Sequence, residues 1–95
     1  MNDSTVRAIL GYLHSHFGNH HISQKVEHEP FSLLFLIEGH GDTHQVRFAR
    51  GILETHTADE LPHLLDSWNF TLEVARAKGL PLVVDTGGIR LETMA

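Results

Sequence analysis

The chain has 95 residues, 41% hydrophobic and 20% charged, a balance typical of one globular domain (residues 1–95) and not of a disordered segment. Its formal charge of −5, with histidines neutral, disfavours nucleic acids and anionic membranes as partners, because their phosphates attract clustered cations. The absence of cysteine excludes disulfides, thiolate metal sites and thiol catalysis. No cationic start followed by an apolar run is visible, so we expect a cytoplasmic location.

The first expected element is a helix that starts near Asp3 or Ser4 and stops at Gly18–Asn19. Its apolar residues recur at the spacing of one buried helical stripe: Val6, Ile9, Leu10, Leu13 and Phe17.

Three antiparallel strands are expected next, over residues 21–28, 31–38 and 43–53. Turns at Glu29–Pro30 and at residues 39–42 would pair His28 with Phe31 and Glu38 with Thr43. In that register one face collects the apolar side chains of all three strands: Ile22, Val26, Phe31, Leu33, Phe35, Ile37, Val46 and Phe48. A slip of one residue would scatter this set, so the agreement supports the register.

A second helix is predicted to begin at TADE, a capping box in which Thr57 and Glu60 bond each other's free backbone N–H groups. Because Pro62 lies early in this segment, a start of the regular helix nearer Glu60 is the alternative. It is expected to continue to Gly79 with one apolar stripe: Leu61, Leu65, Trp68, Leu72 and Ala75. Two short strands, within LPLVVD and IRLE, follow it. The predicted fold class is therefore α+β, an antiparallel sheet in the order α-β-β-β-α-β-β with two helices packed on one face.

Some apolar residues have no place in this predicted core. Leu34 and Leu36 fall on the outer face of the central strand, while Phe70 and Val74 lie roughly 140–180° from the main stripe of the second helix. One helix cannot bury two opposite sides against one sheet. These four residues are the predicted interface of a homodimer or of a complex with a protein client. The alternative is that the first helix or the terminal hairpin covers one of the patches within the monomer.

Four of the nine histidines stand in HSHFGNHH, residues 14–21. On a helix His14 and His16 lie about 160° apart, and His20 and His21 would point to opposite faces of a strand. The stretch then offers at most two ligands to an ion that needs three or four. We interpret it as the end of a helix and assign it no metal ligand and no cofactor.

A better-aligned set lies on one exposed face of the second helix: His56, Asp59, His63 and Asp66. Acidic residues near a helix N-terminus are also favoured by the helix dipole, without any ion. The set nevertheless keeps a divalent-metal-binding protein or metalloenzyme with His and Asp ligands as the alternative function.

The sequence VVDTGG resembles the aspartic protease signature, in which two hydrophobic residues precede Asp-Thr-Gly. In that family most of the chain follows the triplet, whereas only eight residues follow Gly87 here, so we interpret it as a hairpin turn led by Asp85. Phosphate-loop spacing and a serine-hydrolase elbow are also missing from the sequence. We therefore expect no catalytic residue.

The element order from Val6 to Glu92, with the LLDSWN helix followed by LPLVVDTGGIRLE, resembles the type III secretion chaperone-like fold. The resemblance is one of topology, and this chain lacks the C-terminal helix usual in that family. It implies a homodimer that binds an extended client segment. The predicted function is a small, acidic, non-catalytic protein-binding domain: an adaptor, a chaperone or a regulator.

Overall fold

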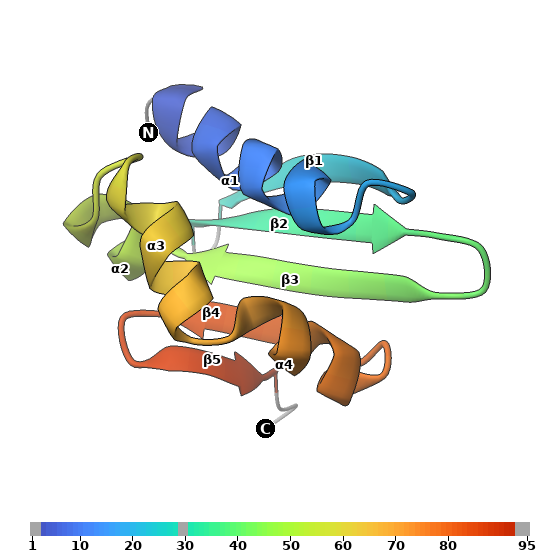
Figure 1. Ribbon diagram of the computed structural model, residues 1–95. Coiled ribbons are helices and arrows are strands. Elements are labelled where there is room, and N and C mark those ends of the chain that lie inside the picture. The colour runs from blue at the N-terminus through green and yellow to red at the C-terminus, as the bar shows by residue number, and fades with distance from the viewer. Residues whose placement is uncertain (1–2, 29–30, 93–95) are drawn as a thin grey trace.

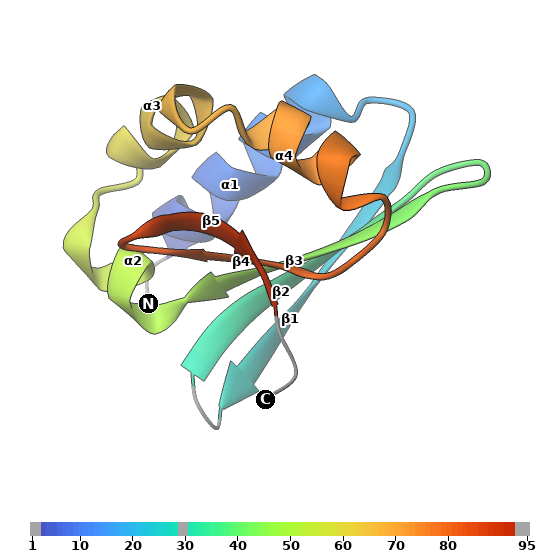
Figure 2. The ribbon, with the colours of Figure 1, turned by 90° about the horizontal axis from the view of Figure 1, so that it is seen from below.

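The computed structural model describes residues 3–28 and 31–92, so the turn expected at Glu29–Pro30 lies outside the described residues. The elements are α1 (Asp3–His16), β1 (His21–His28), β2 (Phe31–Glu38), β3 (Thr43–Ala49), α2 (Arg50–Thr55), α3 (Glu60–Ser67), α4 (Phe70–Ala77), β4 (Leu82–Asp85) and β5 (Gly88–Leu91). They form an α+β fold with a five-stranded sheet (Figure 1). Figure 2 shows α1, α3 and α4 on one side of this sheet, with α2 at the end where β3 stops. The prediction places two helices on that face, whereas the structure has three there, α1, α3 and α4.

The sheet has the order β1-β2-β3-β4-β5. Its first three strands are antiparallel, and the predicted pairs His28–Phe31 and Glu38–Thr43 are confirmed. The prediction of a wholly antiparallel sheet is wrong, because β3 and β4 are parallel. The chain between them forms three helices that carry it back to the end where β3 began, and such a crossover yields a parallel pair.

The third strand ends earlier than predicted. It stops at Ala49, and the expected strand residues Arg50–Leu53 instead belong to α2. Ile52 and Leu53 are adjacent, and both are buried. Neighbouring residues of a strand point to opposite faces, so a helical turn is what allows both side chains to reach the core.

The helix predicted from Thr57 to Gly79 is divided in two. Asn69, between α3 and α4, has φ 55° and ψ 49°, a left-handed conformation that asparagine tolerates better than most residues. The capping box itself is confirmed: the Thr57 N–H donates to Glu60 Oε1 at 2.7 Å, and the Glu60 N–H donates to Thr57 Oγ1 at 3.3 Å. These hydrogen bonds lower the pKa of Glu60.

The division of the helix changes which side of its second half is buried. Phe70 and Val74 are 0% and 1% exposed, whereas Leu72, expected in the core, is 53% exposed. The ring of Phe70 packs edge-on against Tyr12 and also contacts Phe48. Phe70 and Val74 are therefore core residues, and their prediction as an interface is wrong.

The α1–α3 contact includes a hydrogen bond from the Tyr12 hydroxyl to Asp66 Oδ1 at 2.8 Å. Burial, together with that bond, raises the pKa of Tyr12. Beneath it, Ile9 and Leu13 of α1 are fully buried against the sheet. This contact fixes the side of α1 that faces α3.

The sheet face opposite the helices carries Leu34 and Leu36, both half-buried, and their role as an interface stays a prediction. Beside them Arg47 Nε donates to Glu27 Oε1 at 2.7 Å and the guanidinium also contacts Glu92. The Arg47 hydrogen bond lowers the pKa of Glu27. Within residues 3–28 and 31–92, no helix is long and apolar enough to cross a membrane.

We expect Phe70→Ala to lower the free energy of unfolding by about 3–5 kcal/mol, because it leaves a cavity in a fully buried position. Leu72→Ala, on the exposed side of the same helix, is the matched control and should change it by no more than about 0.5 kcal/mol. Urea denaturation followed by circular dichroism measures both. A larger loss of stability with Leu72→Ala than with Phe70→Ala would contradict the division at Asn69 and support a single continuous helix.

Candidate metal centre

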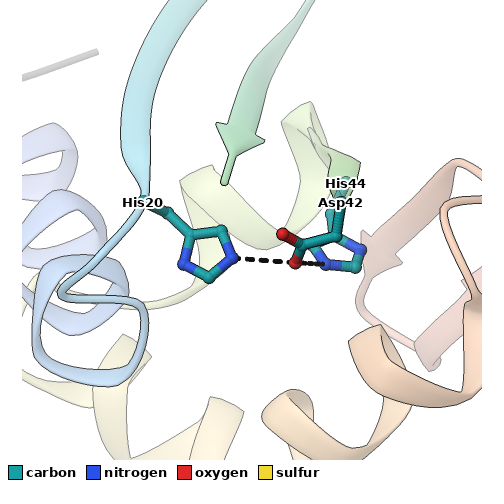
Figure 3. Close-up of side chains that lie close together, drawn as sticks. All are labelled: His20, Asp42 and His44. Atoms are coloured by element: carbon teal, nitrogen blue, oxygen red, sulfur yellow. Dashed lines mark hydrogen bonds and ion pairs between the residues drawn. The ribbon is translucent and has the colours of Figure 1, made fainter. Parts of the chain in front are cut away.

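Three side chains with metal-binding atoms meet where the loop after α1 approaches the β2–β3 hairpin. They are His20, Asp42 and His44, and one donor atom from each lies within 4.8 Å of the other two. The Nε2 atoms of His20 and His44 are 2.8 Å and 2.9 Å from the same carboxylate oxygen, Asp42 Oδ2. Figure 3 shows the carboxylate between the two imidazole rings.

The strand register brings these residues together. Glu38, the last residue of β2, pairs with β1 on one side and with β3 on the other. One step beyond it, His20 and Asp42 lie on either side of Gly39. The Gly39 N–H donates to the Asp42 carbonyl oxygen at 2.8 Å and closes the turn. His20, Gly39 and Asp42 therefore occupy the cross-strand positions that follow the last regular pairs.

Alternation along the strands decides which face the three side chains share. Residues two apart point the same way, so His44 follows Val46, which is buried beneath the helices. The same spacing relates Asp42 to His44, and His20 to the half-buried Ile22. All three groups thus extend the apolar face of the sheet.

Gly39 provides the space in which the groups meet. A Cβ atom built on it would lie 2.5 Å from Asp42 Oδ1 and 2.6 Å from both Cδ2 and Nε2 of His20. Neither group could keep its position beside an alanine. The glycine thus leaves the space in which the ends of these two side chains meet.

The site is apolar on one side and open on the other. The ring of Phe17 lies edge-on to His20 at 5.5 Å between centroids and 6.3 Å from His44. The His20 and His44 side chains are 20% and 13% exposed, whereas that of Asp42 is 43% exposed. Solvent therefore reaches the group through the carboxylate.

The hydrogen bonds from His20 and His44 lower the pKa of Asp42, so its carboxylate stays ionised to a lower pH than that of an ordinary aspartate. An ionised carboxylate only accepts hydrogen bonds, so each Nε2 donates. In a neutral ring the other nitrogen, Nδ1, then carries no proton. Both Nδ1 atoms are buried and, among the described residues, have no hydrogen-bond partner, which agrees with that tautomer.

Two imidazoles and one carboxylate also suit a cation. Zinc bonds of about 2.0–2.1 Å at tetrahedral angles would separate the donor atoms by roughly 3.3 Å. The two Nε2–Oδ2 distances, 2.8 Å and 2.9 Å, need to widen by only about half an ångström to reach that value. Three protein ligands leave at least one coordination position for water or an external ligand.

Of the four histidines in HSHFGNHH, only His20 takes part. His14, His16 and His21 are exposed, and His16 lies 3.8 Å from Asp66 on another side of α1. The prediction that the four imidazoles diverge therefore agrees with the structure. The other two donors come from GHGDTH, a stretch whose local pattern predicts only a turn and the start of a strand.

The second predicted set does not converge. Although His56, Asp59 and His63 line one shallow, open cleft, Asp66 bonds to Tyr12 instead. The four residues do not bring three donor atoms within 4.8 Å of one another in the part of the chain that the structure describes. The signal that could have identified the real cluster is the register itself, extended by one residue past Glu38.

Comparison of the chain with protein-family models, with curated proteins and with solved structures finds no match. The function is therefore inferred from the residues of the chain alone. The most informative of these are the three donors around Gly39.

In metal-free protein at pH 8 we expect His20 and His44 to be Nε2–H tautomers, because only Nε2 has an acceptor. Long-range ¹H–¹⁵N correlation spectra of the imidazoles identify the protonated nitrogen. The exposed His21 and His40 serve as internal controls, with averaged tautomers. A proton on Nδ1 of His20 or His44 would contradict the geometry.

Proposed function

We propose that this chain binds a divalent first-row transition-metal ion, foremost Zn²⁺, through His20, Asp42 and His44. The observation that supports this most strongly is the convergence of three donor atoms within 4.8 Å from two separate segments. The glycine between them adds to it, because a Cβ atom at that position would occupy the same space. This proposal develops the metal-binding alternative with a different set of ligands.

The types of donor favour a transition metal. Imidazole nitrogen suits zinc, copper, iron and nickel, whereas magnesium and calcium prefer sites made of oxygen. Two of the three donors are imidazoles, so Zn²⁺ and Ni²⁺ should bind and Mg²⁺ should not.

The surroundings of the ligands set a moderate affinity. Metal-binding histidines usually donate the second ring N–H to a carboxylate, a carbonyl or water, and losing such a partner weakens binding by about 10–100-fold. The buried Nδ1 atoms of His20 and His44 have no such partner within the described residues. We expect binding weaker than in zinc sites whose histidines have these partners.

Isothermal titration calorimetry of the metal-free chain should show saturable Zn²⁺ binding near one ion per chain, and no heat with Mg²⁺. His20→Ala, Asp42→Ala and His44→Ala should each reduce the affinity by at least about tenfold, since each removes one of three donors. His21→Ala and His40→Ala replace exposed neighbouring histidines and should leave it unchanged.

Two results would refute the assignment. One is the absence of saturable Zn²⁺ or Ni²⁺ binding by the unmodified chain. The other is loss of binding in the double variant His56→Ala/His63→Ala, which would move the ion to the cleft beside α3.

Gly39→Ala should weaken Zn²⁺ binding by about 10–100-fold although it removes no donor, because its Cβ displaces His20 and Asp42. Gly18→Ala is the matched control in the neighbouring loop, where the nearest atom would be at an ordinary 3.5 Å. Zn²⁺ titrations of the two variants, with their melting temperatures in excess EDTA, separate lost binding from lost folding. Equal affinities would show that Gly39 does not position the donors.

A non-catalytic protein-binding role, as a homodimeric adaptor, chaperone-like protein or regulator, is the second candidate. It is favoured by the half-buried Leu34 and Leu36 on the sheet face opposite α1, α3 and α4 (Figure 2). Native mass spectrometry with metal analysis distinguishes the candidates, because it reports subunit number and bound ion together. A metal-free dimer favours the second.

A further inference from the structure

The two edges of the sheet differ in length. Strand β1 lies at one edge with eight residues, while β5 lies at the other with four. The outward backbone groups of an edge strand can pair with another strand. A long edge supplies the larger template, so β1 is the edge suited to a partner.

The helix side of the β1 edge carries apolar side chains on either side of the polar, exposed Gln24. On α1, Val6 and Leu10 are turned about 120° and 160° from Tyr12, which faces α3. Both are partly buried, and they lie on the side of α1 away from α3. On β1, Ile22 is partly buried and Val26 is 40% exposed.

We propose that a second copy of this chain pairs antiparallel with β1, with Gln24 opposite Gln24 of the second copy. Two five-stranded sheets then join into one sheet of ten strands, with α1, α3 and α4 of both copies on the same side. The pairing is independent of the metal centre, whose three donors come from a single chain.

The side chains of β1 complement one another in this register. On the helix side, Ile22 of each copy lies opposite Val26 of the other, so apolar groups meet. On the outer side Ser23 lies opposite Lys25, and His21 lies opposite the acidic Glu27. The register thus places an imidazole opposite a carboxylate at each end, and Glu27 already accepts a hydrogen bond from Arg47 of its own chain.

Neighbouring registers are worse. A shift by two residues in one direction places Lys25 opposite Lys25, and like charges directly opposite are destabilising. The shift in the other direction places Ile22 opposite the polar Gln24 and separates His21 from Glu27. A shift by one places Ile22 opposite Lys25, which mixes the apolar and charged faces.

The outer sheet face is the competing surface, and its charges are already satisfied within the chain. Arg47 contacts both Glu27 and Glu92, and Arg90 lies 3.0 Å from Asp85. A second copy seated there would have to cover these ion pairs, whereas pairing through β1 leaves Arg47 and Arg90 in place.

Sedimentation equilibrium should show a dimer of twice 10.7 kDa. Val26→Lys should raise the dimer dissociation constant by at least about tenfold, because it places a charge opposite Ile22 at two symmetric positions. Its exposed position leaves the monomer fold intact, which circular dichroism checks.

The register is tested by a thiol, since the chain has no cysteine. Gln24→Cys should form a covalent dimer in an oxidising glutathione buffer, because directly opposite residues bring Cα atoms within about 4.5–5.5 Å, a separation that a disulfide spans. Gln45→Cys, exposed on β3, is the control and should stay monomeric on non-reducing gels.

A monomer at 100 µM, or equal cross-linking of the two cysteine variants, would overturn the proposal. A dimer that survives Val26→Lys and dissociates with Leu34→Glu would overturn it too, and would place the interface on the outer sheet face. A purified monomer that binds a foreign extended peptide along β1 would show that the edge serves a client and not a second copy.

Discussion

The register of the three long strands is the constraint on which the other features depend. Phe35 of β2 lies opposite Val46 of β3, and alternation from that pair sends the large apolar side chains beneath the helices. A slip by one residue would turn them to the opposite face. The same register continues past the last pair and aligns His20, Gly39 and Asp42. The three candidate donor atoms therefore lie where the buried face of the sheet reaches solvent, held in place by the pairing that builds the core.

Much of the fold follows from local sequence, because alternation and capping are local signals. The pairing of the first three strands and the Thr57–Glu60 capping box are examples. The break at Asn69 is not predictable in this way, because the apolar period that leads to Leu72 continues across it. The break becomes apparent only from the packing of the core, where Phe70 is buried and Leu72 is exposed. The parallel pairing of β3 with β4 depends on where three helices return the chain, and no short stretch of sequence encodes that.

The candidate site could not be predicted from the sequence for a related reason. Helical and strand periods describe each segment alone, and by those periods the histidines of HSHFGNHH diverge. The partner of His20 lies across the sheet, because Asp42 belongs to the β2–β3 hairpin 22 residues further along the chain. The predicted pairing of Glu38 with Thr43, extended by one residue, already places Asp42 beside Gly39. The role of Gly39 is different, since the need for a missing side chain becomes visible only when the ring and the carboxylate have positions.

The arrangement of protons bears on how tightly the proposed site would bind an ion. Without metal, His20 and His44 direct two Nε2–H groups at one ionised carboxylate, and the bare Nδ1 atoms tolerate burial. An ion bound by Nε2 moves each proton to Nδ1, where the described residues offer no acceptor. A buried donor left unpaired costs about 1–3 kcal/mol. For an ion to bind, its bonds to both imidazoles and to Asp42 would together have to exceed two such penalties. The hydrogen bonds that assemble the donors thus also compete with the metal for them.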